Sequence, residues 1–169
     1  IDTAQTNYLA LLNANSYDKG AWVLYMLHRE IGDSAFFRGL RSYYAKYRDS
    51  TALSDDLRRE LEQTSGRSLQ QFFDQWLRRP GVAEPAIGWA FDASTGNVSL
   101  FVQQESPRGP YAFPLTVVVT DADNAAHRVS VAVPADARAT LPLAGRYERK
   151  PKSVSFDPDG VLLARITRL

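Results

Sequence analysis

The chain has 169 residues, of which 44% are hydrophobic and 23% charged; these proportions are ordinary for one large or two small globular domains and exclude extended disorder. Twenty basic and nineteen acidic side chains give a net charge of +1. The chain therefore lacks the excess of basic residues that is typical of proteins that bind nucleic acid or anionic membranes. The absence of cysteine excludes disulfides and thiolate metal sites, and no apolar run approaches the ~20 residues of a membrane span.

The first half of the chain shows helical periodicity. Residues 1–12 are predicted to be helical toward their end, and residues 18–31 form a helix that is apolar on nearly every side. A helix without a polar face is typically buried among others. Gly32 is expected to end it, and Asp33 or Ser34 to cap the next helix. The apolar positions of that next helix are Phe36, Phe37, Leu40, Tyr43, Tyr44 and Tyr47.

Two shorter helices are predicted to follow. Ser54 is expected to cap the first, with Asp55 and Asp56 in its first turn, where the helix dipole favours negative charge, and Gly66 is expected to end it. Ser68 is expected to cap the second. Its apolar face and its stop signal consist of Leu69, Phe72, Phe73, Trp76, Leu77, Pro80 and Gly81.

After Gly81 the apolar pattern changes to alternation, which indicates short strands. Three alternating sets are present: Val98, Leu100 and Val102; Phe113, Leu115, Val117 and Val119; and Val129, Val131 and Val133. Turn-rich segments separate them, and the prolines at 114, 134 and 142 are expected at strand edges or ends. The sequence therefore predicts a two-domain α+β protein, with a helical bundle over residues 1–82 and an antiparallel β-sandwich over residues 83–169.

Metal and nucleophile motifs are scarce. The chain has two histidines, His28 and His127, and neither belongs to a His-Glu-x-x-His pair, so both are interpreted as structural or surface residues. A Gly-x-Ser-x-Gly motif does not occur. Asp55 and Asp56 are interpreted as acidic residues favoured by the helix dipole at a helix start, not as a catalytic pair. Tyr17 precedes the first apolar helix, where its phenol could point into a cleft, although composition and period alone favour a structural tyrosine.

Several short segments of the chain match the segments of one known family in order and spacing. The first is Tyr17-Asp18-Lys19-Gly20-Ala21, which is similar to the family's Tyr-x-Lys-Gly segment. The others run through the predicted helices and the start of the sandwich: Ile31-Gly32-Asp33, Phe36-Phe37, Ser54-Asp55-Asp56-Leu57, Glu62, Ser65-Gly66, Phe72-Phe73, Gln75-Trp76-Leu77, Pro80-Gly81, Trp89, Val102-Gln103-Gln104, Phe113-Pro114-Leu115 and Phe156-Asp157-Pro158-Asp159-Gly160. Together these segments resemble the aminopeptidase-N-like zinc metallopeptidases of the gluzincin clan. That family usually has a second proline soon after the position of Pro80-Gly81, and here it falls at Pro85.

The resemblance implies a function and a role for one residue. Family members remove N-terminal residues from peptides, with zinc held by a His-Glu-x-x-His helix and a later glutamate. The helical bundle would be the end of a thermolysin-like catalytic domain, and Tyr17 would donate its hydroxyl to the oxyanion. The zinc ligands, general base and Gly-x-Met-Glu-Asn loop lie upstream in the family. The chain starts at Ile1, so it is expected to be a processed or truncated piece that binds no zinc and is inactive alone.

Three interpretations remain open at this point. The first is the C-terminal part of a zinc aminopeptidase, whose partners are peptides and its own zinc-bearing N-terminal part. The second is a non-catalytic peptide-binding or scaffolding module with the same fold, and the third is a partner that completes a separate zinc-bearing chain. An exposed apolar helix face would favour the first and third, whereas a closed helical layer with Tyr17 buried would favour the second. A periplasmic or secreted location is expected from bacterial members with this domain layout.

Overall fold

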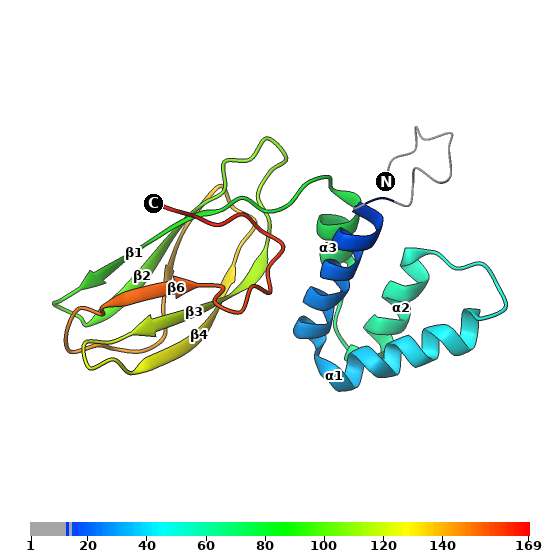
Figure 1. The fold of residues 1–169 in the computed structure, drawn as a ribbon, viewed down its shortest axis with the longest axis horizontal. Helices are drawn as coiled ribbons and strands as arrows, with labels where there is room; N and C mark the ends of the chain where they lie inside the picture. The colour runs from blue at the N-terminus through cyan, green and yellow to red at the C-terminus, as the bar shows by residue number, and fades with distance from the viewer. Residues whose placement is uncertain (1–12, 14) are drawn as a thin grey trace. The chain divides into compact units, whose positions relative to one another are not determined.

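The computed structural model describes residue 13 and residues 15–169. The chain divides into two compact units, Ile1–Pro80 and Gly81–Leu169. The helix expected toward the end of residues 1–12 lies outside the described residues. Among the residues described, no helix has the length and apolar character needed to cross a membrane. The architecture is α+β, with helices in the first unit and sheets in the second (Figure 1).

The first unit begins with a π-helical turn and continues as one long helix. Its elements are η2 (Asn15–Lys19), α1 (Gly20–Tyr47), α2 (Ser54–Ser65), α3 (Gln70–Phe73) and η3 (Asp74–Arg78). The buried core of this unit draws on α1, α2 and the α3–η3 segment, with Leu27, Leu61, Leu69, Phe73 and Trp76 almost wholly inaccessible.

Gly32 is where the structure bends α1. The sequence predicted two helices separated at this glycine, and the kink confirms it: within α1 Gly32 has non-helical angles, φ 79° and ψ 161°, and a helix lies on each side of it. These angles are accessible essentially to glycine alone, because a Cβ would collide with the neighbouring peptide groups. The two halves of α1 consequently run in clearly different directions (Figure 1).

The first half of α1 is less buried than the sequence predicted. Val23, Met26 and Leu27 are buried, but Trp22, Leu24 and Tyr25 keep exposed fractions of 42%, 39% and 42%. The prediction of a helix buried on all sides is therefore wrong for this chain. In the second half, Phe37 and Tyr44 are likewise exposed, while Phe36 is buried.

Carboxylates, not serines, cap the shorter helices. The expected cap Ser54 is the first residue of α2, and Asp56 Oδ2 accepts the hydrogen bond of the Leu53 N–H at 2.8 Å. Similarly, Ser68 does not cap α3, because the N–H of Leu69 donates to Glu62 Oε1 at 2.7 Å. The expected end of α2 is confirmed, since Gly66 adopts a left-handed conformation with φ 68° and ψ 15°.

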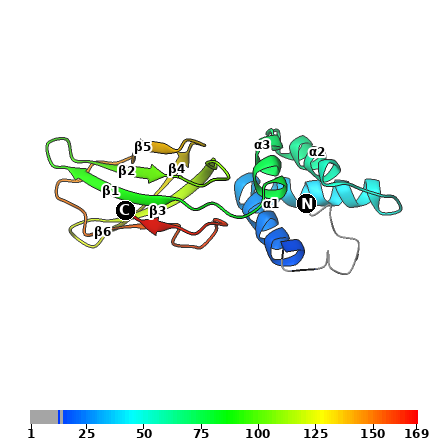
Figure 2. The ribbon, with the colours of Figure 1, turned by 90° about the horizontal axis from the view of Figure 1, so that it is seen from above.

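The second unit contains two sheets of short strands. Its elements are β1 (Ala86–Asp92), β2 (Asn97–Gln103), β3 (Phe113–Thr120), β4 (Ala126–Val133), β5 (Arg138–Pro142), β6 (Ser153–Phe156) and β7 (Thr167–Arg168). The strand orders are β5-β2-β1-β7 and β4-β3-β6. Figures 1 and 2 show the two sheets stacked as a sandwich.

The alternating apolar sets occupy strands as predicted. On β2 and β3 the inward positions are buried, namely Val98, Leu100, Val102, Phe113, Leu115, Val117 and Val119. Pro114 is tolerated within β3 because β6 pairs only with Val117–Thr120, so no second strand needs a donor at position 114. One pairing departs from the predicted antiparallel sandwich: β7 runs parallel to β1, with Ala86 opposite Thr167.

Candidate functional site

Tyr17 lies in the π-helical turn η2, immediately before α1. Its backbone N–H donates to the carbonyl of Asn13 at 3.1 Å. Its side chain is 61% exposed, so the phenol is open to solvent instead of being packed in the core. A tyrosine at this position can therefore present a neutral hydrogen-bond donor to a molecule outside the helical unit.

An apolar surface continues from Tyr17 along α1. We call Trp22, Leu24 and Tyr25 the exposed α1 face, and the rings of Trp22 and Tyr25 meet edge to face with centroids 6.4 Å apart. Helical spacing puts Tyr25 opposite the buried Val23 and Leu27, while Trp22 and Leu24 lie on the two flanks of this buried side. The first half of α1 thus has two apolar sides, and the helical unit covers one of them.

Lys19 connects the turn of Tyr17 to the end of the last helix. Its Nζ donates a hydrogen bond to the carbonyl oxygen of Arg79 at 3.0 Å, joining residues 60 positions apart. Arg79 ends η3 in an extended conformation, φ −84° and ψ 136°, as is usual for a residue before proline. Partial burial lowers the pKa of Lys19 from its ordinary value, because desolvation disfavours the ammonium.

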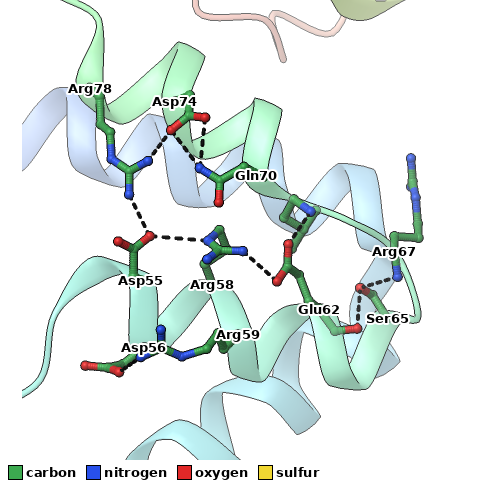
Figure 3. A network of polar contacts seen from close by, with 11 residues as sticks. Asp55, Asp56, Arg58, Arg59, Glu62, Ser65, Arg67, Gln70, Asp74 and Arg78 are labelled. Carbon is green, nitrogen blue, oxygen red and sulfur yellow. Dashed lines mark hydrogen bonds and ion pairs between the residues drawn. The ribbon is translucent and has the colours of Figure 1, made fainter.

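A polar network joins η3 to α2 (Figure 3). Arg78 donates to Asp55 at 2.6 Å and also to Asp74, while Arg58 donates to Asp55 at 3.3 Å and to Glu62 at 2.7 Å. The hydrogen bond from Arg58 and the charge of Arg78 lower the pKa of Asp55. Asp55 and its neighbours therefore fix the helices to one another, which agrees with a structural interpretation of the acidic pair at 55 and 56.

Both histidines have local structural partners. His28 Nε2 lies 2.7 Å from Asp33 Oδ1, and its ring is 4.8 Å from that of Phe36. His127 Nε2 lies 2.7 Å from Asp121 Oδ2. Within residue 13 and residues 15–169, no group of three histidine, aspartate or glutamate side chains is arranged to hold a metal ion. The described residues therefore do not fit a zinc site.

The sandwich unit has a shallow hollow of about 290 Å³ at one end, lined in part by Asp121, Asp123, His127, Tyr147 and Arg149. Four of its polar groups form two pairs: Arg149 Nη2 lies 2.5 Å from Asp123 Oδ1, and Asp121 binds His127. Burial raises the pKa of Tyr147. These four groups satisfy one another, and the charged residues Arg146 and Glu148 also line the hollow.

Sequence reasoning singled out Tyr17 as a candidate, which stays a prediction, and it missed the hydrogen bond of Lys19 to Arg79. Lys19 was visible only as a member of a short motif, since nothing in the sequence relates it to a carbonyl 60 residues later. The single available signal was Pro80, which fixes the backbone conformation of Arg79.

The helical half of the chain is similar in sequence to known peptidases. Residues 3–76 match the model of the Peptidase family M1 domain. Aminopeptidase N of Lactococcus lactis subsp. lactis is 38% identical over 65 residues, which are 38% of this chain and 8% of that protein. Aminopeptidase N of Streptomyces lividans is 36% identical over 97 residues, or 56% of this chain and 11% of that protein. The chain thus spans about a tenth of the length of these relatives.

A solved structure resembles the whole fold. The crystal structure of Legionella pneumophila aminopeptidase A in complex with aspartic acid matches 96% of this chain with a TM-score of 0.84. The match covers 19% of that structure's chain at 16% sequence identity, so it supports the fold alone.

Proposed function

On the premise that residues 3–76 match the Peptidase family M1 domain, we propose that this chain belongs to the M1 family of aminopeptidase-N-like metallopeptidases and is the C-terminal part of a zinc-dependent aminopeptidase. In this proposal the helical unit completes a catalytic domain whose zinc-bearing part is supplied by upstream sequence. The substrates are peptides, from which the complete protein removes N-terminal residues. The observation that carries the proposal is the exposed α1 face directly after an exposed Tyr17.

The exposed α1 face supports the proposal that another part of the full-length protein packs against this helix. Trp22, Leu24 and Tyr25 are each about 40% exposed although they follow one another on a single helix. Large clustered apolar side chains rarely face water on a self-contained unit and mark surfaces that another protein part covers. Their proximity to Tyr17 in the sequence is what we expect if the covering part also bears the substrate site.

Tyr17 is proposed to donate its hydroxyl to the oxygen of the scissile peptide carbonyl. That oxygen becomes negative as the carbonyl is attacked, and a neutral donor held ready for it stabilises the transition state more than the ground state. Removing one such donor typically lowers kcat by about 100- to 1,000-fold. The exposed phenol at the end of the helical unit is consistent with this role.

The zinc would have to be held by the upstream part of the protein. The described residues include no group that could bind it, so this chain contributes the tyrosine and the packing surface instead of the metal site. We therefore propose that the chain alone hydrolyses no peptide.

The non-catalytic binding module is less well supported. A closed helical layer with a buried Tyr17 would have favoured it, whereas Tyr17 is 61% exposed. The third interpretation, a partner that completes a separate zinc-bearing chain, predicts the same exposed face and differs only in whether both parts lie on one polypeptide.

The test begins with the coding sequence upstream of Ile1. We expect the frame to continue back to a His-Glu-x-x-His helix, and the full-length protein to cleave aminoacyl-p-nitroanilides. Tyr17→Phe in that protein should lower kcat by about 100- to 1,000-fold with little change in KM. Tyr44→Phe, which alters another exposed tyrosine of α1, is the matched control and should retain wild-type kcat.

An upstream frame without the histidines, or a Tyr17→Phe variant with wild-type kcat, would contradict the proposal. An upstream stop together with activity restored by adding a separate zinc-bearing protein would support the third interpretation. Chelator-sensitive activity of the chain alone would disprove its proposed inactivity.

A further inference from the structure

We propose that Lys19 is a positioning residue for Tyr17, acting by its hydrogen bond to the carbonyl oxygen of Arg79. This inference rests on the proposed function, because it gives Lys19 a part in holding the proposed oxyanion donor. It adds a residue to the site that lies 60 positions from its partner in the sequence.

The turn that carries Tyr17 is tied to a second element by a side chain of its own. Tyr17 and Lys19 belong to the same π-helical turn, η2, which is wider than an α-helical turn and is a rare conformation often found at functional sites. Lys19 Nζ reaches the Arg79 carbonyl at 3.0 Å, so it ties this turn to the end of η3. The direction of the Tyr17 side chain then depends on where Arg79 lies.

Arg79 is itself well fixed. Pro80 restricts it to the extended conformation observed, which sets the direction of its carbonyl group. The preceding residue, Arg78, donates to Asp55 of α2 at 2.6 Å and to Asp74 of η3 (Figure 3). The anchor of Lys19 is therefore connected to the packed part of the helical unit and not to a loose end.

Lys19 differs from the other lysine of the helical unit. The side chain of Lys46 is 59% exposed while it binds Glu60, as is usual for lysine at a surface. Lys19 is partly buried, and desolvation disfavours its charged form. A helix end partly offsets that cost, because its last carbonyl groups lack intrahelical partners and carry partial negative charge.

The test uses kinetics of the full-length protein. A displacement of about 1 Å at a catalytic group can lower the rate about 100-fold, so we expect Lys19→Met to lower kcat by about 10- to 100-fold while KM changes less than about 2-fold. Lys19→Arg, which can still donate to the Arg79 carbonyl, should recover most of the lost kcat. Lys46→Met removes a lysine hydrogen bond from the same helical unit and should leave kcat unchanged.

A double-mutant cycle separates positioning from general damage. If Lys19 acts through Tyr17, then Lys19→Met should have no further effect on kcat in the Tyr17→Phe background. Equal effects of Lys19→Met in both backgrounds would overturn the inference, as would a Lys19→Arg variant no better than Lys19→Met. If Tyr17→Phe lowers kcat but Lys19→Met does not, this inference fails and the proposed function stands. If Tyr17→Phe has no effect on kcat, the proposed function is wrong, and this inference, which depends on it, is wrong as well.

Discussion

The carboxylate of Glu62 accepts a hydrogen bond from the backbone N–H of Leu69, with 2.7 Å between Oε1 and nitrogen. The other oxygen of Glu62 binds Arg58 at 2.7 Å. One side chain of α2 thereby caps α3 and holds an arginine that is itself only 16% exposed. Glu62 therefore supplies, from another helix, the hydrogen-bond acceptor that was expected from Ser68.

We predict that Glu62→Ala lowers the free energy of unfolding by about 1–2 kcal/mol, because it removes a helix cap and a partner of Arg58. Urea unfolding of the chain, followed by far-UV circular dichroism, would measure it. Glu62→Gln should cost less, since its amide oxygen can still accept the Leu69 N–H. The exposed neighbour Gln63, changed to alanine, is the control and should alter stability by less than about 0.5 kcal/mol.

The two glycines of α1 should respond in opposite directions. Gly32→Ala should destabilise the chain by about 1–3 kcal/mol, because φ 79° with ψ 161° is strained for any residue with a Cβ. Gly20→Ala should stabilise it by up to about 1 kcal/mol, since Gly20 is helical and a Cβ there meets no atom within 4 Å. Thermal unfolding of both variants gives the comparison; a neutral Gly32→Ala would mean that the bend does not depend on glycine.

The exposed α1 face should behave differently in the chain and in the full-length protein. Leu24→Asp is expected to cost the chain only about 1 kcal/mol, because Leu24 is 39% exposed and the loss is limited to partial burial and helix propensity. In the full-length protein the same change should cost about 2 kcal/mol or more, since it buries a carboxylate. Val23→Asp, at a buried position of the same helix, should destabilise both proteins. Equal tolerance of Leu24→Asp in both would show that nothing covers this face.

Gln104 supports the sandwich from inside. It is 3% exposed, and its amide pairs with both backbone groups of Tyr111, accepting from the N–H at 3.0 Å and donating to the carbonyl at 2.9 Å. Gln104→Ala should lower the free energy of unfolding by about 2–4 kcal/mol, because it leaves both groups without these partners. The adjacent Gln103, changed to alanine, should cost much less. Near-UV circular dichroism during urea unfolding would follow the sandwich.

Stability should depend on acid pH through Asp92. Hydrogen bonds from the hydroxyls of Ser94 and Thr95 and from the Ser94 N–H lower the pKa of Asp92 to about 2. A lowered pKa contributes stability above the unfolded value near 4, and this contribution is lost as the pH falls through about 2. Asp92→Asn should therefore unfold at a lower temperature than the wild type at pH 7, and the gap should close between about pH 4 and pH 2.

The matched variant for this pH effect is Ser94→Ala, which removes the first of the hydroxyl donors. It should move the pKa of Asp92 back toward its ordinary value, as NMR titration of the carboxyl carbon would report. A constant gap between Asp92→Asn and the wild type from pH 7 to pH 2 would contradict the assignment.

The sequence by itself determined the class of the fold. Helical and alternating periods, with Pro80-Gly81 between them, predicted helices followed by a sandwich, and Gly32 and Gly66 marked a bend and a helix end. These features depend on residues that are neighbours along the chain, because backbone conformation and the spacing of apolar side chains are local properties. The same local order made the Tyr17 segment recognisable.

Tertiary structure decided which side of each helix is covered and which groups meet across long separations. The apolar pattern of residues 18–31 could not reveal that Trp22 stays exposed while Val23 is buried, because burial depends on what packs against a helix. The caps of α2 and α3 came from carboxylates and not from the nearest serines, and Lys19 found a carbonyl 60 residues away. Such contacts form only after the helices pack, since closing a long loop costs entropy that the packed interface must offset.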